Sequence, residues 1–175
     1  MLGLAAVLFF SVTGLTLNHP DWFAGLERVR HAEGTLDPAW LTDQVDQLRI
    51  VEHLRRVHDV RGSLAEFRTD DPYECLIAFR GPGRDADAFV DRQTGRYQLT
   101  QTDHGLIAIL NDLHKGRDTG PVWSLVIDLS AIVLTLISLT GLTLLFYLKL
   151  RRVSGTIVVV AGTLLILAAW LLGVP

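Results

Sequence analysis

The chain has 175 residues, a formal net charge of −3 and one cysteine, and 49% of its residues are hydrophobic. This length allows one or two domains, the single cysteine excludes an internal disulfide, and the lack of a basic excess excludes a polybasic nucleic-acid surface. Three apolar segments, residues 1–17, 122–148 and 153–175, together contain one charged residue. Each approaches or exceeds the roughly 20 residues that cross a bilayer, so the sequence predicts a membrane protein.

The first segment, residues 1–17, is predicted to be a transmembrane helix that is not cleaved. It has neither the basic start nor the small-residue cleavage site of a signal peptide. Pro20 ends the helix, and Trp22 and Phe23 follow at the level of an aromatic belt. A helix of this length would span about 25 Å of a hydrocarbon core that is ~30 Å thick.

Residues 18–121 form a polar block that is expected to fold in water. It contains 13 of the 16 basic residues and 18 of the 19 acidic residues, which gives it a net charge of −5. Residues 30–34 (RHAEG), which include His31, are predicted to be a loop before Asp37. Apolar residues repeat at intervals of three or four over residues 39–58, which predicts a helix.

After residue 62 the apolar period changes to two, which predicts strands. Four short strands are expected, at residues 63–68, 73–80, 87–91 and 96–102. A helix followed by an antiparallel meander predicts an α+β module in which the helix covers one face of the sheet. Residues 105–114 return to helical spacing and lead into the second apolar segment.

The second and third transmembrane helices are expected at residues 122–148 and 154–174. The loop between them, residues 149–153, contains three basic and no acidic residues: Lys149, Arg151 and Arg152. Short basic loops stay in the cytoplasm. The polar block is therefore predicted to lie outside the cytoplasm.

A short phrase occurs twice, once in the first apolar segment and once in the second. Residues 11–17 read SVTGLTL and residues 138–144 read SLTGLTL. Small residues let membrane helices approach closely. We therefore expect a helix-packing role for four residues of the phrase: Thr13, Gly14, Thr140 and Gly141.

Asp128 is the one ionisable residue within an apolar segment. Ionisable residues inside a membrane are candidate functional residues. However, residues 129–148 alone supply 20 uncharged positions, which would place Asp128 at the outer boundary. Two interpretations stay open: an interfacial or helix-pairing carboxylate, and a residue of a cofactor site.

The order of these motifs resembles the PepSY-associated transmembrane-helix family of bacterial inner-membrane proteins. The resemblance covers nearly the whole chain and is carried by four stretches: residues 113–120 (LHKGRDTG), 127–130 (IDLS), 138–142 (SLTGL) and, more weakly, 90–95 (VDRQTG). It implies an extracytoplasmic PepSY module, and such modules bind or restrain other proteins, peptidases among them. Larger relatives look like haem-bearing ferric-siderophore reductases with histidines near their helix ends.

Two of the six histidines, His19 and His114, are predicted at the same membrane boundary, because one follows the first helix and the other precedes the second. Two imidazoles can ligate the iron of a b-type haem. In the other interpretation, His19 binds a loop carbonyl or a lipid headgroup, and His114 caps a helix. Three helices offer little room for a haem group. If the chain binds haem, we therefore expect it to form a homodimer.

No metalloprotease, nucleophile-elbow, phosphate-loop or dinucleotide motif is present in the sequence. We therefore assign no catalytic residue and expect no catalytic activity of the chain's own. The favoured function is an accessory protein of the bacterial inner membrane whose outer domain binds a periplasmic or membrane protein, or another ligand. The alternative is a small haem-binding electron-transfer protein that assists metal or ferric-siderophore reduction.

Overall fold

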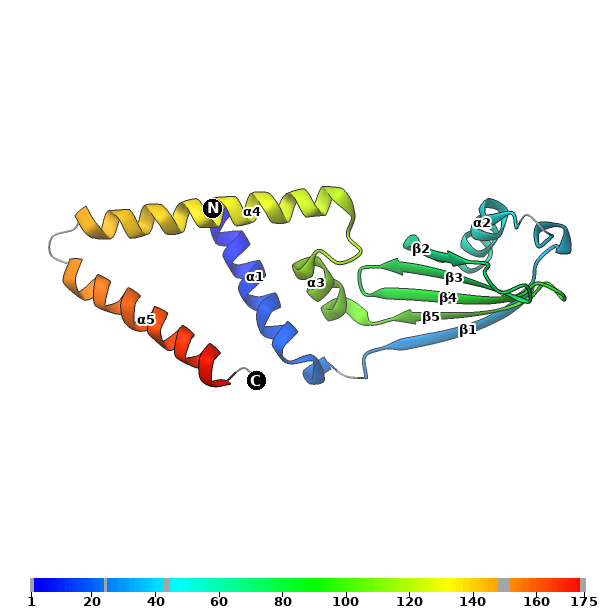
Figure 1. Ribbon diagram of the computed structural model, residues 1–175, viewed down its shortest axis with the longest axis horizontal. Helices are drawn as coiled ribbons and strands as arrows, with labels where there is room; N and C mark the ends of the chain where they lie inside the picture. The colour runs from blue at the N-terminus through cyan, green and yellow to red at the C-terminus, as the bar shows by residue number, and fades with distance from the viewer. Residues whose placement is uncertain (1, 24, 43–44, 148–151, 174–175) are drawn as a thin grey trace. The chain divides into compact units, whose positions relative to one another are not determined.

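Figure 1 shows the computed structural model of the protein, which describes residues 2–23, 25–42, 45–147 and 152–173. The chain divides into two units. The larger unit is residues 7–128, and the smaller unit joins residues 1–6 to residues 129–175. Each unit is described by itself.

A five-stranded antiparallel sheet forms the centre of the larger unit, with the strand order β1-β5-β4-β3-β2. The strands are β1 (Arg28–Thr35), β2 (Ser63–Arg68), β3 (Glu74–Gly81), β4 (Arg84–Asp91) and β5 (Arg96–Asp103). Strands β2 to β5 follow one another as hairpins, which confirms the predicted meander. Strand β1 joins the sheet at the free edge of β5.

Strand β1 corrects two expectations, a loop before Asp37 and a sheet of four strands. Six of its eight residues are exposed, so it lacks the apolar alternation that marks a half-buried strand. His31 lies within it, and its Nδ1 is 3.2 Å from Thr100 Oγ1 on β5. Gly34 pairs with Tyr97, and a side chain at Gly34 would collide with the Tyr97 ring.

The predicted helix of residues 39–58 is two shorter helices, η2 (Pro38–Trp40) and α2 (Gln47–His58). Helix α2 begins later than expected because Asp46 caps it. The Asp46 carboxylate accepts a hydrogen bond from Arg49 N at 3.1 Å, which satisfies one of the free N–H groups of the first turn.

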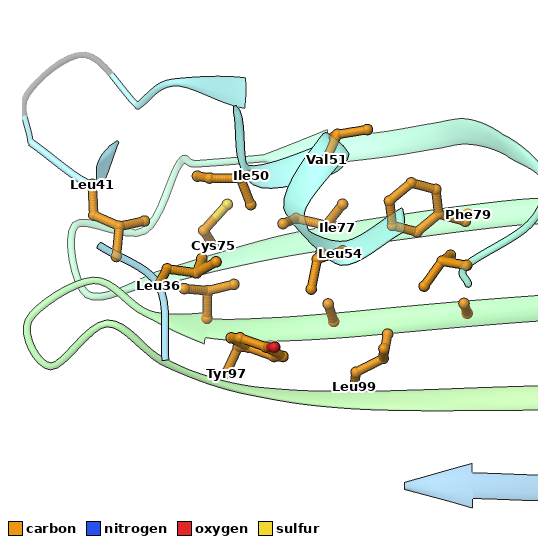
Figure 2. Close-up of a cluster of buried hydrophobic side chains, with 14 residues drawn as sticks. Leu36, Leu41, Ile50, Val51, Leu54, Cys75, Ile77, Phe79, Tyr97 and Leu99 are labelled. Atoms are coloured by element: carbon orange, nitrogen blue, oxygen red, sulfur yellow. The ribbon is translucent and has the colours of Figure 1, made fainter. Parts of the chain in front are cut away.

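Helix α2 covers one face of the sheet, as the sequence predicted, and the hydrophobic core lies between them (Figure 2). The helix contributes Ile50, Val51 and Leu54; the sheet contributes Cys75, Ile77, Phe79, Ala86, Ala88, Val90, Tyr97 and Leu99. Burial raises the pKa of the Cys75 thiol to about 11, and the nearby Arg92 charge opposes this only in part. The single cysteine is therefore a protonated, apolar core residue.

Both ends of the sheet module lead into helices. Helix α1 (Leu2–Asn18) and the turn η1 (Pro20–Phe23) come before β1. Helix α3 (Gly105–Lys115) follows β5 and leads to α4 (Gly120–Tyr147).

In the smaller unit, α4 continues and α5 (Arg152–Gly173) follows it. Among the described residues, α4 and α5 are the two helices that are long and apolar enough to cross a membrane. Helix α1 has 17 residues and falls short of that length, so two of the three predicted membrane helices meet the criterion. Most of the predicted cytoplasmic loop, at 149–151, and the last residue of the predicted third helix, 174, lie outside the described residues.

Candidate functional site

Helix α3 is fixed to the sheet at the β3–β4 turn. Gly83 in this turn has a φ of +64°, and its N–H donates to Asp112 Oδ2 at 2.7 Å. A Cβ at Gly83 would lie 2.8 Å from the backbone N of Ile109, so only glycine allows the helix to approach this closely. The Gly83 carbonyl also accepts a hydrogen bond from His104 N at 2.9 Å.

The opposite side of α3 is bonded to α1. Thr13 Oγ1 lies 2.5 Å from His114 Nδ1, and Thr16 Oγ1 donates to Asn111 Oδ1 at 2.6 Å. These four residues are called the polar joint. Thr13 is polar but buried, with 2% of its surface exposed, and it is the one polar side chain of this kind among the described residues.

The hydrogen bonds of Thr13 assign the tautomer of His114. The Thr13 hydroxyl donates to the Phe9 carbonyl at 2.6 Å, so its proton is already used. Nδ1 of His114 must therefore carry the proton and donate to Thr13 Oγ1. The edge of the Phe10 ring contacts the imidazole, with ring centroids 5.1 Å apart.

The first turns of α4 join the same contact. Trp123 Nε1 donates to the Leu113 carbonyl at 2.8 Å, and the Trp123 ring meets the edge of Phe9. Helices α1 and α3 and the start of α4 are therefore held together by hydrogen bonds and aromatic contacts. These contacts place the sheet module at a fixed position on α1.

The two histidines predicted as haem ligands have separate partners. The His19 ring stacks on Trp22, with centroids 4.1 Å apart and planes 3° from parallel. His114 contacts Thr13, which lies six residues before His19, or about 9 Å along the axis of α1. No contact among the described residues joins the two rings, since each has its own partner. The haem site stays a prediction.

The other predicted site residues differ in their surroundings. Asp128 is exposed on α4 and has no hydrogen bond or ion pair among the described residues. A Cβ at Gly14 would lie 3.7 Å from His114 Cε1. In the smaller unit, the Thr140 hydroxyl donates to the Leu136 carbonyl of its own helix, and a Cβ at Gly141 would meet nothing within 4 Å. Their packing role stays a prediction.

His104 is the centre of a cluster that the sequence did not predict. His104 Nδ1 lies 2.9 Å from Glu27 Oε1, and its Nε2 lies 3.1 Å from Asp85 Oδ2. Burial disfavours the imidazolium, but the hydrogen bonds and charges of the two carboxylates outweigh burial and raise the pKa of His104. The His104 ring therefore links the segment before β1 to β4 through these two carboxylates.

Among the described residues, the face of the sheet opposite α2 carries no helix of the core cluster. Side chains alternate along a strand, so residues between the core positions point to this face. We call it the open face, and it includes Val29, His31, Leu76, Arg80, Asp87, Phe89, Gln98 and Thr100. Phe89 and Val29 are 53% and 52% exposed, and Arg80 Nη1 binds Asp87 Oδ1 at 2.7 Å beside them.

The polar joint gives a stability prediction. Replacing Thr13 by Val keeps the side-chain shape but leaves His114 Nδ1 without its acceptor, which should cost about 1–3 kcal/mol of unfolding free energy. Denaturant unfolding of the detergent-solubilised protein, followed by Trp fluorescence, measures this loss. Thr140→Val is the control, because that hydroxyl binds only its own helix. Equal losses in both variants would contradict the role of the joint.

The His104 cluster gives a pH dependence. Because the folded state raises the pKa of His104, its stabilisation is complete below the ordinary value of 6.5 and is lost as the pH rises through the raised pKa. The difference in melting temperature between wild type and His104→Gln should therefore be largest below pH 6.5 and shrink above it. His31→Gln, at an exposed histidine, is the control. A difference that is constant with pH would show that His104 does not act through its charge.

Comparison with known protein families matches the whole chain, residues 1–175, to the family described as PepSY_TM-like. No match was found among curated proteins or among solved structures. The family match confirms the resemblance carried by the motifs around His114, Asp128 and Gly141. The chain therefore belongs to the PepSY_TM-like family.

Proposed function

We propose that this protein is a membrane-anchored accessory protein whose sheet module binds a protein partner outside the cytoplasm through the open face. The observation that carries the proposal is the open face itself. One side of the sheet is covered by α2, while the other exposes Phe89 and Val29 among charged and polar side chains. Aromatic side chains surrounded by polar groups are typical of protein interfaces.

The shape of the open face favours a protein over a small molecule. Small ligands bind in concave pockets that bury most of their surface. On the open face, Phe89 projects from β4 and Val29 from β1, with β5 between the two strands. The Arg80–Asp87 ion pair on the same face supplies charged groups with which a partner can form hydrogen bonds.

Anchoring is supported by family membership and by the apolar helices α4 and α5. We include α1 as a third, short membrane helix, since its 17 residues would span about 26 Å. The polar joint then ties α3, and with it the sheet module, to α1.

The proposed orientation rests on the basic residues between α4 and α5. Three cations without an anion in a short loop favour the cytoplasmic side, which places residues 18–121 outside. Combined with the family resemblance, this gives the inner membrane of a bacterium as the location. The accessory role, rather than catalysis, follows from the lack of catalytic motifs in the sequence.

The orientation is tested with alkaline phosphatase fusions, since this enzyme is active only outside the cytoplasm. A fusion after Arg92, within the module, should be active, and a fusion after Arg152 should be inactive. Western blots of both fusions control for expression. The opposite pattern of activities would place the module in the cytoplasm and would overturn the proposal.

The partner-binding surface is tested by photo-crosslinking in intact cells. A photoreactive amino acid at Phe89 or Val29 should form a discrete adduct with another protein. The control positions are Leu48 and Val57, which are exposed on α2, 71% and 53% respectively, and face away from the sheet. Identical adducts from the α2 positions, or none from the open face, would show that the open face is not the binding surface.

A further inference from the structure

A cleft lies on the α2 side of the sheet, beyond the C-terminal end of that helix. Its volume is about 270 Å³. Four arginines and three carboxylates from several parts of the chain line it: Arg28, Arg30, Arg61, Arg84, Asp59, Asp85 and Asp103. We call it the arginine cleft.

The register of the sheet builds the floor of the cleft. Arg28 on β1 pairs with Asp103 on β5, which pairs in turn with Arg84 on β4. Arg30 pairs with Gln101 in the next row on the same face. Residues two apart on a strand lie about 6.8 Å from each other, so Arg28 and Arg30 can bind one anionic group from the same side.

The charges of the cleft do not cancel. Arg61 Nη2 binds Asp59 Oδ2 at 3.0 Å, and Arg84 Nε lies 3.5 Å from Asp103 Oδ2. Arg28 and Arg30 have no ion pair or hydrogen bond among the described residues. Two exposed guanidinium groups on one strand are therefore free to bind an anion.

Besides the ion-paired Asp59 and Asp103, two features of the cleft oppose an anion. One is Asp85, whose Oδ2 lies 3.1 Å from His104 Nε2. The other is the end of α2, because a helix C-terminus carries partial negative charge. This effect is reduced by Gln101, whose Nε2 donates to the His58 carbonyl at 3.1 Å. With four arginines and three carboxylates, the lining has a formal charge of +1. The arginines without an ion pair among the described residues are Arg28 and Arg30.

Strands β1 and β4 begin and β5 ends at the end of the sheet from which α3 continues (Figure 1). Three lining residues stand at these strand ends: Arg28, Arg84 and Asp103. Leu26, just before β1, lies beside Gly105 at the start of α3, with a Cβ at Gly105 only 3.8 Å from Leu26 Cβ. Leu26 and Trp22 are 56% and 61% exposed. Exposed Trp and Leu between an apolar helix and a polar domain are typical of the headgroup layer.

From these observations, we propose that the arginine cleft binds the phosphate of an anionic phospholipid headgroup and thereby seats the module on the membrane surface. The proposal rests on the membrane anchoring of the proposed function. Arg28 and Arg30 form charge-assisted hydrogen bonds with the phosphate oxygens, as guanidinium groups do with phosphate in a forked geometry. Arg84 and Arg61 also bind the phosphate. To do so, they give up part of their contacts with Asp103 and Asp59.

A lipid is favoured over a soluble anion for two reasons. Residues 18–121 have a net charge of −5, so the module as a whole repels free anions. A lipid beside α1 is instead held near the cleft by the bilayer, which raises its effective concentration. At physiological salt the Debye length is about 8 Å, so the arginines of the cleft attract mainly anions that are already this close. A headgroup held in the bilayer beside α1 meets that condition.

The test uses the full chain, purified in an uncharged detergent and freed of lipid. Native mass spectrometry measures binding of phosphatidylglycerol and of phosphatidylcholine to the wild type, to Arg28→Gln/Arg30→Gln and to Arg56→Gln/Arg96→Gln. The last variant is the matched control, because it removes two exposed arginines outside the cleft. Circular dichroism melting verifies that each variant folds.

The wild type and the control should prefer phosphatidylglycerol, and the cleft variant should bind it roughly tenfold more weakly. Unchanged binding by the folded cleft variant would overturn the proposal. Calorimetric titration with sn-glycerol 3-phosphate separates the two sources of phosphate: cleft-dependent binding of this soluble anion without cleft-dependent binding of the lipid would also overturn it. Crosslinking from Phe89 reports on the open face independently, so loss of lipid binding alone leaves the proposed function standing.

Discussion

The hydrogen bond from Gly83 N to the Asp112 carboxylate holds α3 on the sheet. The hydrogen bonds between the module and α1 depend on this position of α3. Successive residues of an α-helix are rotated by about 100°. Ile109 and Asp112 therefore share one side of α3 and face the hairpin turn, while Asn111 and His114 share the other side and face α1. Helix α3 is therefore hydrogen-bonded to the sheet on one side and to α1 on the other. It forms a bridge between them.

A bridge of this kind makes the module a rigid extension of α1. A module on a flexible linker would rotate freely, and its binding surface would have no fixed direction. Here, the chain of contacts from the β3–β4 turn through α3 to Thr13 consists of buried or partly buried hydrogen bonds. Such bonds are costly to leave unpaired. In the proposed function, these bonds hold the open face in place relative to α3 and the adjoining part of α1.

Most of the sheet could be predicted from the sequence because strands β2 to β5 each bury one face. Burial on one face gives the period of two that the prediction used. The edge strand β1 has exposed residues on both faces and gives no such signal. The start of α2 was missed for a related reason. Leu41 belongs to the core, so apolar spacing alone extended the helix past its cap at Asp46.

The functional residues were harder to predict, since their partners are far away in the sequence. Thr13 and His114 are 101 residues apart, and both were selected for other reasons: Thr13 for the repeated phrase, and His114 as a haem ligand. The sequence identified two important residues and could not show that they contact each other. His104 was missed as a site because Glu27 and Asp85 reach it from two different segments.

Strand β1 contributes to both proposed binding surfaces, which makes its register the critical feature of the module. Arg28 and Arg30 point to the arginine cleft, and Val29 and His31 point to the open face. A slip of one residue would exchange these two sets, since side chains alternate along a strand. Gly34 prevents the slip, because its neighbours Glu33 and Thr35 could not fit against the Tyr97 ring. The lack of a side chain at Gly34 thus fixes the register of β1. This register keeps Arg28 and Arg30 on the cleft face and Val29 on the open face.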